Sequence, residues 1–141
     1  MSRIINLTPH SLVILQEDEL GDHEVVIGRG AAARRGVVSI ALTIPPRVDG
    51  AGRPLPAAAK EFNTPVAPLI LNGILVPLIE RRFGPPIDLP EPKEGVLLFV
   101  GGITLAAAVA SGRPTADLVT PGEAVTKDGK PFGVLSLARH G

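Results

Sequence analysis

Arginines are the residues of this chain best suited to chemistry. Their planar guanidinium groups bind phosphate or carboxylate groups through two parallel hydrogen bonds. Six of the ten arginines lie in three short segments: Arg29, Arg34 and Arg35; Arg81 and Arg82; and Arg113. The other interpretation is that these arginines are solvated or pair with the fourteen acidic residues of the chain. A ligand role predicts that several of them share one pocket.

Two further residues have types that suit a ligand site. His10 follows Thr8-Pro9 and either contacts a ligand or bonds a loop carbonyl. Asp117 lies four residues after Arg113, so it either accepts from that guanidinium or caps backbone N–H groups in its own loop. Both of these roles for Asp117 would fix the loop. We take His10, Arg34, Arg113 and Asp117 as the candidate ligand-binding residues.

Catalytic and cofactor motifs do not occur in the sequence. His10, His23 and His140 lie far apart, none has the i, i+4 spacing of a helical metal site, and the chain has no cysteine. No serine lies in a GxSxG motif, and no GxxxxGK[ST] stretch is present. The segment "GRGAAARRG" at 28–36 precedes a predicted strand, whereas a dinucleotide-binding turn precedes a helix. We therefore expect no catalytic site, metal or cofactor.

Composition bounds the class of protein. The 141 residues fit one domain, and the formal net charge of zero argues against nucleic-acid or membrane-surface partners. Aromatic residues make up only 3 %, while there are 15 prolines and 16 glycines. This composition favours short strands joined by tight turns, with a core of aliphatic residues. The uncharged stretch 96–112 is shorter than the roughly 20 residues of a membrane span, and it predicts a buried strand followed by a helix.

The predicted elements are mostly strands. Residues 4–15 form a strand kinked at Pro9, which pairs with 24–28 as a hairpin, and a further strand covers 37–44. The loop 28–36 is expected to be flexible. Asn72-Gly73 and Asp128-Gly129 each predict a tight hairpin turn.

The segment 67–79, "APLILNGILVPLI", allows two interpretations. A hairpin is favoured over a helix because Pro77 would fall in the helix interior. A helix is instead predicted for about residues 103–112, where alanines precede Gly112. The fold class is thus α+β: one domain, 1–141, with a mostly antiparallel sheet of six to eight short strands, one main helix, and an apolar hairpin insertion near 67–80.

Three stretches carry a resemblance: "INLTPH" at the start, "LPEPKEG" at 89–95 and "RPTADLVTPGEAVTKDGKPFGV" at 113–134. In this order they resemble small bacterial and phage-encoded proteins of no established activity that begin with an Asn-Leu-Thr-Pro-His strand. The matched positions are Asn6, Thr8, Pro9, His10, Leu89, Pro90, Gly95, Arg113, Asp117, Leu118, Pro121 and Gly122. This chain departs from the pattern through Thr115 and Ala116, and through the apolar segment 65–82. The resemblance implies a compact β-rich domain and a phage-related role in host interaction or defence evasion.

Two functional hypotheses follow. The first is a non-catalytic protein that binds a small nucleotide-like anion through the four candidate residues. The alternative is a structural or assembly module, such as a virion-surface protein, that forms oligomers and docks on a viral or host protein. Under either hypothesis the apolar hairpin predicts a homo-oligomer, because an exposed patch of several hundred Å² would otherwise promote aggregation. The expected location is the cytoplasm of a bacterial or archaeal host, or the virion.

Overall fold

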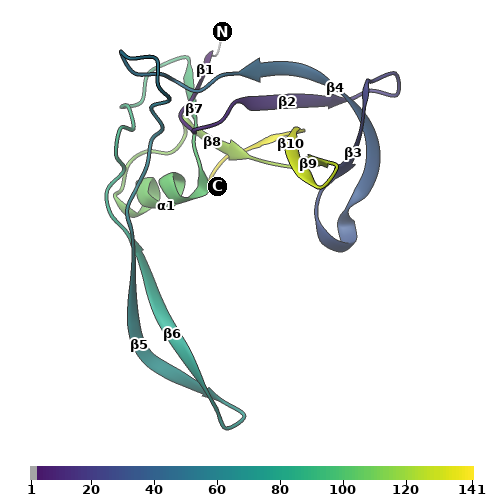
Figure 1. The fold of residues 1–141 in the computed structure, drawn as a ribbon. Coiled ribbons are helices and arrows are strands. Elements are labelled where there is room, and N and C mark those ends of the chain that lie inside the picture. The colour runs from purple at the N-terminus through teal and green to yellow at the C-terminus, as the bar shows by residue number, and fades with distance from the viewer. Residues whose placement is uncertain (1–2) are drawn as a thin grey trace.

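The computed structural model describes residues 3–141 and divides the strands among three β-structures (Figure 1). A closed barrel has the order β10-β2-β4-β3-β9 and is formed by β2 (Leu12–Glu17), β3 (His23–Ile27), β4 (Arg34–Ile44), β9 (Ala124–Lys127) and β10 (Lys130–Val134). A four-stranded sheet has the order β1-β7-β8-β11 and is formed by β1 (Arg3–Asn6), β7 (Val96–Phe99), β8 (Leu118–Pro121) and β11 (Leu137–Ala138). A separate hairpin is formed by β5 (Glu61–Leu71) and β6 (Ile74–Phe83).

Helical structure is limited to two segments of the described chain. The 3-10 helix η1 spans Gly30–Ala32, and the α-helix α1 spans Gly102–Ala110. Gly112 follows α1 with a φ of +78°, a conformation that glycine adopts without steric cost. None of the helices within residues 3–141 is long and apolar enough to cross a membrane.

The expectation of a mostly antiparallel sheet is wrong, because the sheets are mixed. β1 pairs with β7, β7 with β8, and β10 with β2, all in parallel. Parallel neighbours need a crossover, and α1 provides the one between β7 and β8. The structure also has eleven strands over residues 3–141 rather than six to eight, and β4 and β5 each have 11 residues.

The start of the chain also differs from its predicted pairing. Residues 4–15 form two strands, β1 in the sheet and β2 in the barrel, with Pro9 in the connection. β2 and β3 do not pair with each other; β4 lies between them and pairs antiparallel with both. β4 begins at Arg34, so two of the three arginines of the predicted loop are strand residues. The long β4 therefore lies between β2 and β3, the two strands that the sequence predicts to pair directly with each other.

Buried apolar residues form three clusters. One lies inside the barrel around Val38 and Val125, and one joins the sheet to α1 around Val100 and Ala108. The third cluster contains Leu12, Phe99, Val119 and Val134, and it connects the barrel to the sheet. Burying such a side chain stabilises a fold by about 1.5–3 kcal/mol. None of the buried residues in these clusters belongs to β5 or β6, so the barrel and sheet form a body with its own core.

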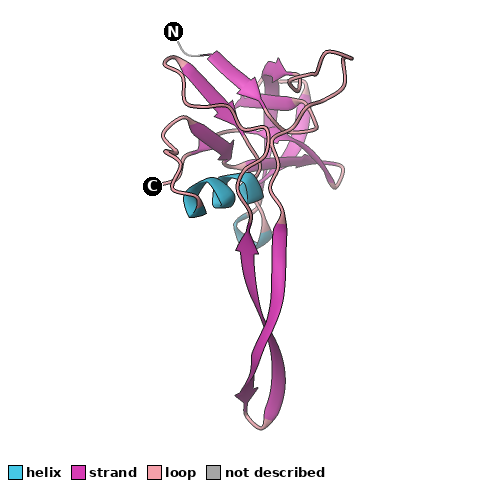
Figure 2. Cartoon of the chain, turned by 90° about the vertical axis from the view of Figure 1, so that its left-hand side faces the viewer, coloured by secondary structure: helices cyan, strands magenta, loops and turns pink. Residues whose placement is uncertain are grey.

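The β5–β6 hairpin projects from this body as a long ribbon (Figures 1 and 2). It turns at Asn72-Gly73, whose φ angles of +50° and +76° suit a tight two-residue turn. It is longer than the predicted insertion at 67–80. We refer to residues 61–83 as the arm.

The contact between β10 and β2 that closes the barrel can be tested by a substitution at Gly133. The parallel β10–β2 seam is registered at Val134 and Ile14, and a Cβ on Gly133 would lie 2.7 Å from the Val13 carbonyl oxygen. Gly133→Ala should therefore lower the free energy of unfolding by about 2 kcal/mol through overpacking, measured by chemical denaturation. Gly50→Ala is the control, because a Cβ added there would have no neighbouring atom within 4 Å. Equal stability of the two variants would contradict this account of the seam.

Candidate functional site

The outer half of the arm is apolar around its whole circumference. Residues 65–79 contain no charged side chain, and all eleven residues of β5 are exposed. In β6 only Val76 and Phe83 are partly covered. The most exposed large hydrophobic residue of the arm, Ile70, is 72 % accessible. This surface has the character of a protein core but lies outside the body.

The inner half of the arm is polar and internally paired. Arg81 forms an ion pair with Glu61 and donates to the Asn63 amide oxygen, while Arg82 pairs with Glu80. These pairs are largely exposed, so each contributes at most about 1 kcal/mol. Arg81 and Arg82 therefore bind acids of their own hairpin, and charge is confined to the end of the arm nearest the body.

Two chain segments, 45–60 and 84–95, join the arm to the body and are held together at its root. Gly84 N–H donates to the Lys60 carbonyl at 2.8 Å. Ala58 and Ile87 exchange two backbone hydrogen bonds, at 3.0 and 2.7 Å. The ladder of the arm therefore continues for a short distance toward the body.

Arg47 links the two root segments to each other and to β1. Its guanidinium donates to the Leu55 carbonyl from Nε and Nη2, at 3.1 and 2.8 Å, and to the Asp88 carbonyl at 2.9 Å. Its backbone N–H donates to the Asn6 carbonyl at 2.8 Å. Neighbouring Ala57 is buried, donates to the Leu7 carbonyl, and accepts a long bond from Thr104 of α1. The root is thus fixed to both β1 and α1.

Arg113 and Asp117 form the most complete ion pair of the described chain. Arg113 Nη1 and Nη2 donate to the two Asp117 carboxylate oxygens at 2.8 and 2.9 Å, and each side chain is only 11 % exposed. The same nitrogens donate to the carbonyls of Pro114 and Pro90 at 2.6 and 2.7 Å. Because Pro90 lies in the segment 84–95, this pair fastens a second point of the arm root to the loop after α1.

The Asn-Leu-Thr-Pro-His stretch is organised by Asn6, whose side chain is 1 % exposed. Its Nδ2 donates to the carbonyls of His10 and Ile44 at 2.7 and 3.0 Å. Its Oδ1 accepts from the Thr8 backbone N–H and hydroxyl at 3.0 and 2.7 Å. His10 contributes its carbonyl to this network, and the residue is exposed. The motif therefore builds the turn between β1 and β2.

Arg34 lies at the opposite end of the barrel, where it forms an ion pair with Glu17. The shallow hollows beside it are lined by Glu17, Asp18 and Glu19 on one side and by Glu123 on the other. This concentration of carboxylates opposes the binding of an anion.

The structure does not bring the four predicted ligand residues together. Leu12 pairs with Ile44, so His10 lies near the end of β4, whereas Arg34 begins that strand ten residues earlier. At about 3.3 Å per residue these positions are about 33 Å apart along β4. Arg113 and Asp117 are adjacent to each other but belong to the sheet side of the body.

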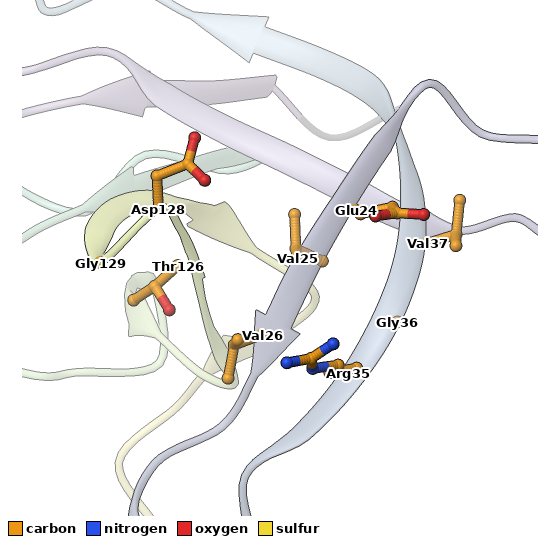
Figure 3. A pocket seen from close by; sticks show the side chains of 9 residues that line it. All are labelled: Glu24, Val25, Val26, Arg35, Gly36, Val37, Thr126, Asp128 and Gly129. Carbon is orange, nitrogen blue, oxygen red and sulfur yellow. The ribbon is translucent and has the colours of Figure 1, made fainter.

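A separate hollow of about 520 Å³ lies on the barrel between β3, β4 and the β9–β10 turn (Figure 3). Its charged residues Glu24, Arg35 and Asp128 come from different edges of the hollow, and the apolar Val25 and Val26 also line it. None of the four predicted ligand residues lines it. Ligand sites gather a few convergent polar groups in a concave apolar pocket, and this open hollow lacks that convergence.

Sequence reasoning missed two parts of this arrangement. Arg47 was not among the candidates because its partners are backbone carbonyls, which leave no mark in the side-chain sequence. The extent of the arm did leave a signal. Glu61 and Arg81 carry opposite charges on the two sides of Asn72-Gly73, and in the register they are diagonal cross-strand neighbours, because Arg81 lies opposite Asn63 and Glu61 opposite Phe83.

Comparison of the chain with protein-family models, with curated proteins and with solved structures finds no match.

The Arg113–Asp117 pair generates a direct prediction. Arg113→Ala removes four hydrogen bonds and leaves a mostly buried carboxylate unpaired, so the free energy of unfolding should fall by about 3 kcal/mol, measured by urea denaturation. Arg34→Ala is the matched control, because its exposed ion pair should contribute less than about 1 kcal/mol. Similar losses for both variants would refute the anchoring role of Arg113.

Proposed function

We propose that this protein is a non-catalytic assembly module whose arm docks on protein surfaces, other copies of this chain among them. The observation that carries the proposal is the uncharged outer half of the arm, residues 65–79, which is exposed on both faces. Contiguous apolar patches larger than a few hundred Å² mark interaction sites on soluble proteins. A two-stranded hairpin alone is also marginally stable in water, so a partner that covers it would stabilise its structure.

The hydrogen bonds at the root of the arm indicate that the body holds the arm in a fixed orientation. Arg47 and Arg113 direct their guanidinium groups to backbone carbonyls of the two segments that lead into the arm. A docking element gains affinity when it is held in its bound orientation beforehand, because less conformational entropy is lost on binding. The body therefore serves as the support that orients the arm.

Small-anion binding, the other hypothesis, has weaker support. Arg34 already pairs with Glu17 beside further carboxylates, and Arg113 already donates to Asp117 and two carbonyls. An anion would have to displace these partners. The assembly hypothesis needs no such rearrangement, and it fits a phage-related protein in the cytoplasm of a host or in the virion.

Removing the arm tests the proposal. Residues 63–81 are replaced by Asn-Gly, which joins Phe62 to Arg82 through the turn sequence that the arm already uses. The full chain should form oligomers at micromolar concentration in sedimentation velocity, and the shortened chain should be a monomer. Its cooperative thermal unfolding should persist, because the three buried clusters contain no arm residue.

The control keeps the apolar half and alters the polar half. Asn63→Ser should associate like the unaltered chain. A full chain that stays monomeric at every concentration would refute the proposal. Oligomers of unchanged size after removal of the arm would refute it equally.

A further inference from the structure

The register of the arm assigns each side chain to one of two faces. Val66 lies opposite Leu78, Leu69 opposite Val76, and Leu71 opposite Ile74. Cross-strand pairs alternate between faces, and an extra residue between Val66 and Leu69 keeps these three pairs on the same side. We call this surface the ladder face. It is a continuous run of three pairs of large aliphatic residues.

The opposite face is less regular. It carries the pairs Ile70–Leu75 and Pro65–Ile79, which are separated by the bulge that contains Ala67 and Pro68 opposite Pro77. The rigid prolines and the small alanine interrupt its run of large aliphatic side chains. The two faces of the same ribbon therefore offer different packing surfaces, and the ladder face is the one suited to close packing.

The edges of the arm are protected against strand addition. Gly84 N–H donates to the Lys60 carbonyl, so residues 60 and 84 form a hydrogen-bonded pair of the antiparallel ladder. Hydrogen-bonded and non-hydrogen-bonded pairs alternate along such a ladder, and the backbone N–H and C=O positions of residue 65 therefore point away from β6. By the same alternation, residue 77 lies at an outward position of β6. Both are prolines and lack the N–H that an added strand needs. A partner must therefore cover a face of the arm.

We infer that two copies of this chain associate by packing their ladder faces against each other. This inference rests on the proposed assembly function and names its partner and its surface. A two-fold contact requires the same patch on both copies to be self-complementary. The three apolar pairs of the ladder face meet this condition because they carry no charge, and the charged residues farther along the same face, Glu80 and Arg82, form an ion pair with each other.

The size of the ladder face is sufficient for a specific contact. Its exposed aliphatic residues, together with Phe62 on the same face, are 37 % to 65 % accessible. At roughly 180 Å² for a fully exposed residue, two such faces bury about 1,000 Å², the lower bound for a specific interface. Complete burial of the ladder face together with Phe62 therefore just reaches the size of a specific interface.

Cross-linking distinguishes the two faces. The natural chain has no cysteine, so a single cysteine reports only its own position. Val76→Cys lies in the middle pair of the ladder face, and Leu75→Cys, its neighbour in the chain, lies on the opposite face. Packed sheets lie about 10 Å apart, so a short bismaleimide is the appropriate reagent. We expect at least fivefold more covalent dimer from Val76→Cys than from Leu75→Cys.

A second pair of variants tests the same surface without a cross-linking reagent. Leu69→Asp should abolish dimers in sedimentation velocity, whereas Ile70→Asp on the opposite face should leave them. Both positions are exposed and outside the core, so both variants should fold. If the natural chain forms arm-dependent oligomers but cross-linking and the Asp variants show no preference for the ladder face, the inference fails and the assembly function stands. A monomeric natural chain overturns both.

Discussion

The side-chain amide of Asn6 is the interaction on which the rest of the structure depends. This buried amide donates to two carbonyls and accepts from the Thr8 N–H and hydroxyl, and its partners belong to the β1–β2 turn and to the end of β4. β1 is an edge strand of the sheet, and β4 is the barrel strand between β2 and β3. A buried amide that lost these partners would cost about 1–3 kcal/mol for each orphaned group. Asn6 therefore sets the relative position of the two β-structures.

The same residue begins the path of contacts that leads to the arm. Its backbone carbonyl accepts from Arg47, whose guanidinium holds the carbonyls of Leu55 and Asp88. The next contacts along the two segments are the Ala58–Ile87 bridge and the Lys60–Gly84 bond. Arg113 supports this path from the other side through Pro90. Because every step is a hydrogen bond to backbone, the direction of the arm is determined where it leaves the body.

Local chemistry made part of this fold predictable. Asn72-Gly73 and Asp128-Gly129 specify tight turns because few residues tolerate a positive φ, and the alanines before Gly112 specify α1. Parallel pairing of β1 with β7 was not predictable, because it joins residues more than ninety positions apart and leaves no local pattern. The candidate arginines Arg34 and Arg113 were predicted as ligand residues, with pairing to acidic residues of the chain as the other interpretation. Their partners, however, are carbonyls and carboxylates of the chain itself, which only the folded structure brings within reach.

The prolines of the arm explain how so apolar a ribbon remains a specific surface. An exposed two-stranded hairpin has two open edges, and apolar strands with open edges tend to add further strands without limit. Pro65 and Pro77 remove a donor from the middle of each edge, while the bulge at Pro68 interrupts one face. Of the surfaces that could grow or associate, the ladder face alone remains regular. The sequence thereby leaves this aggregation-prone hairpin one regular surface, and a single partner is enough to cover it.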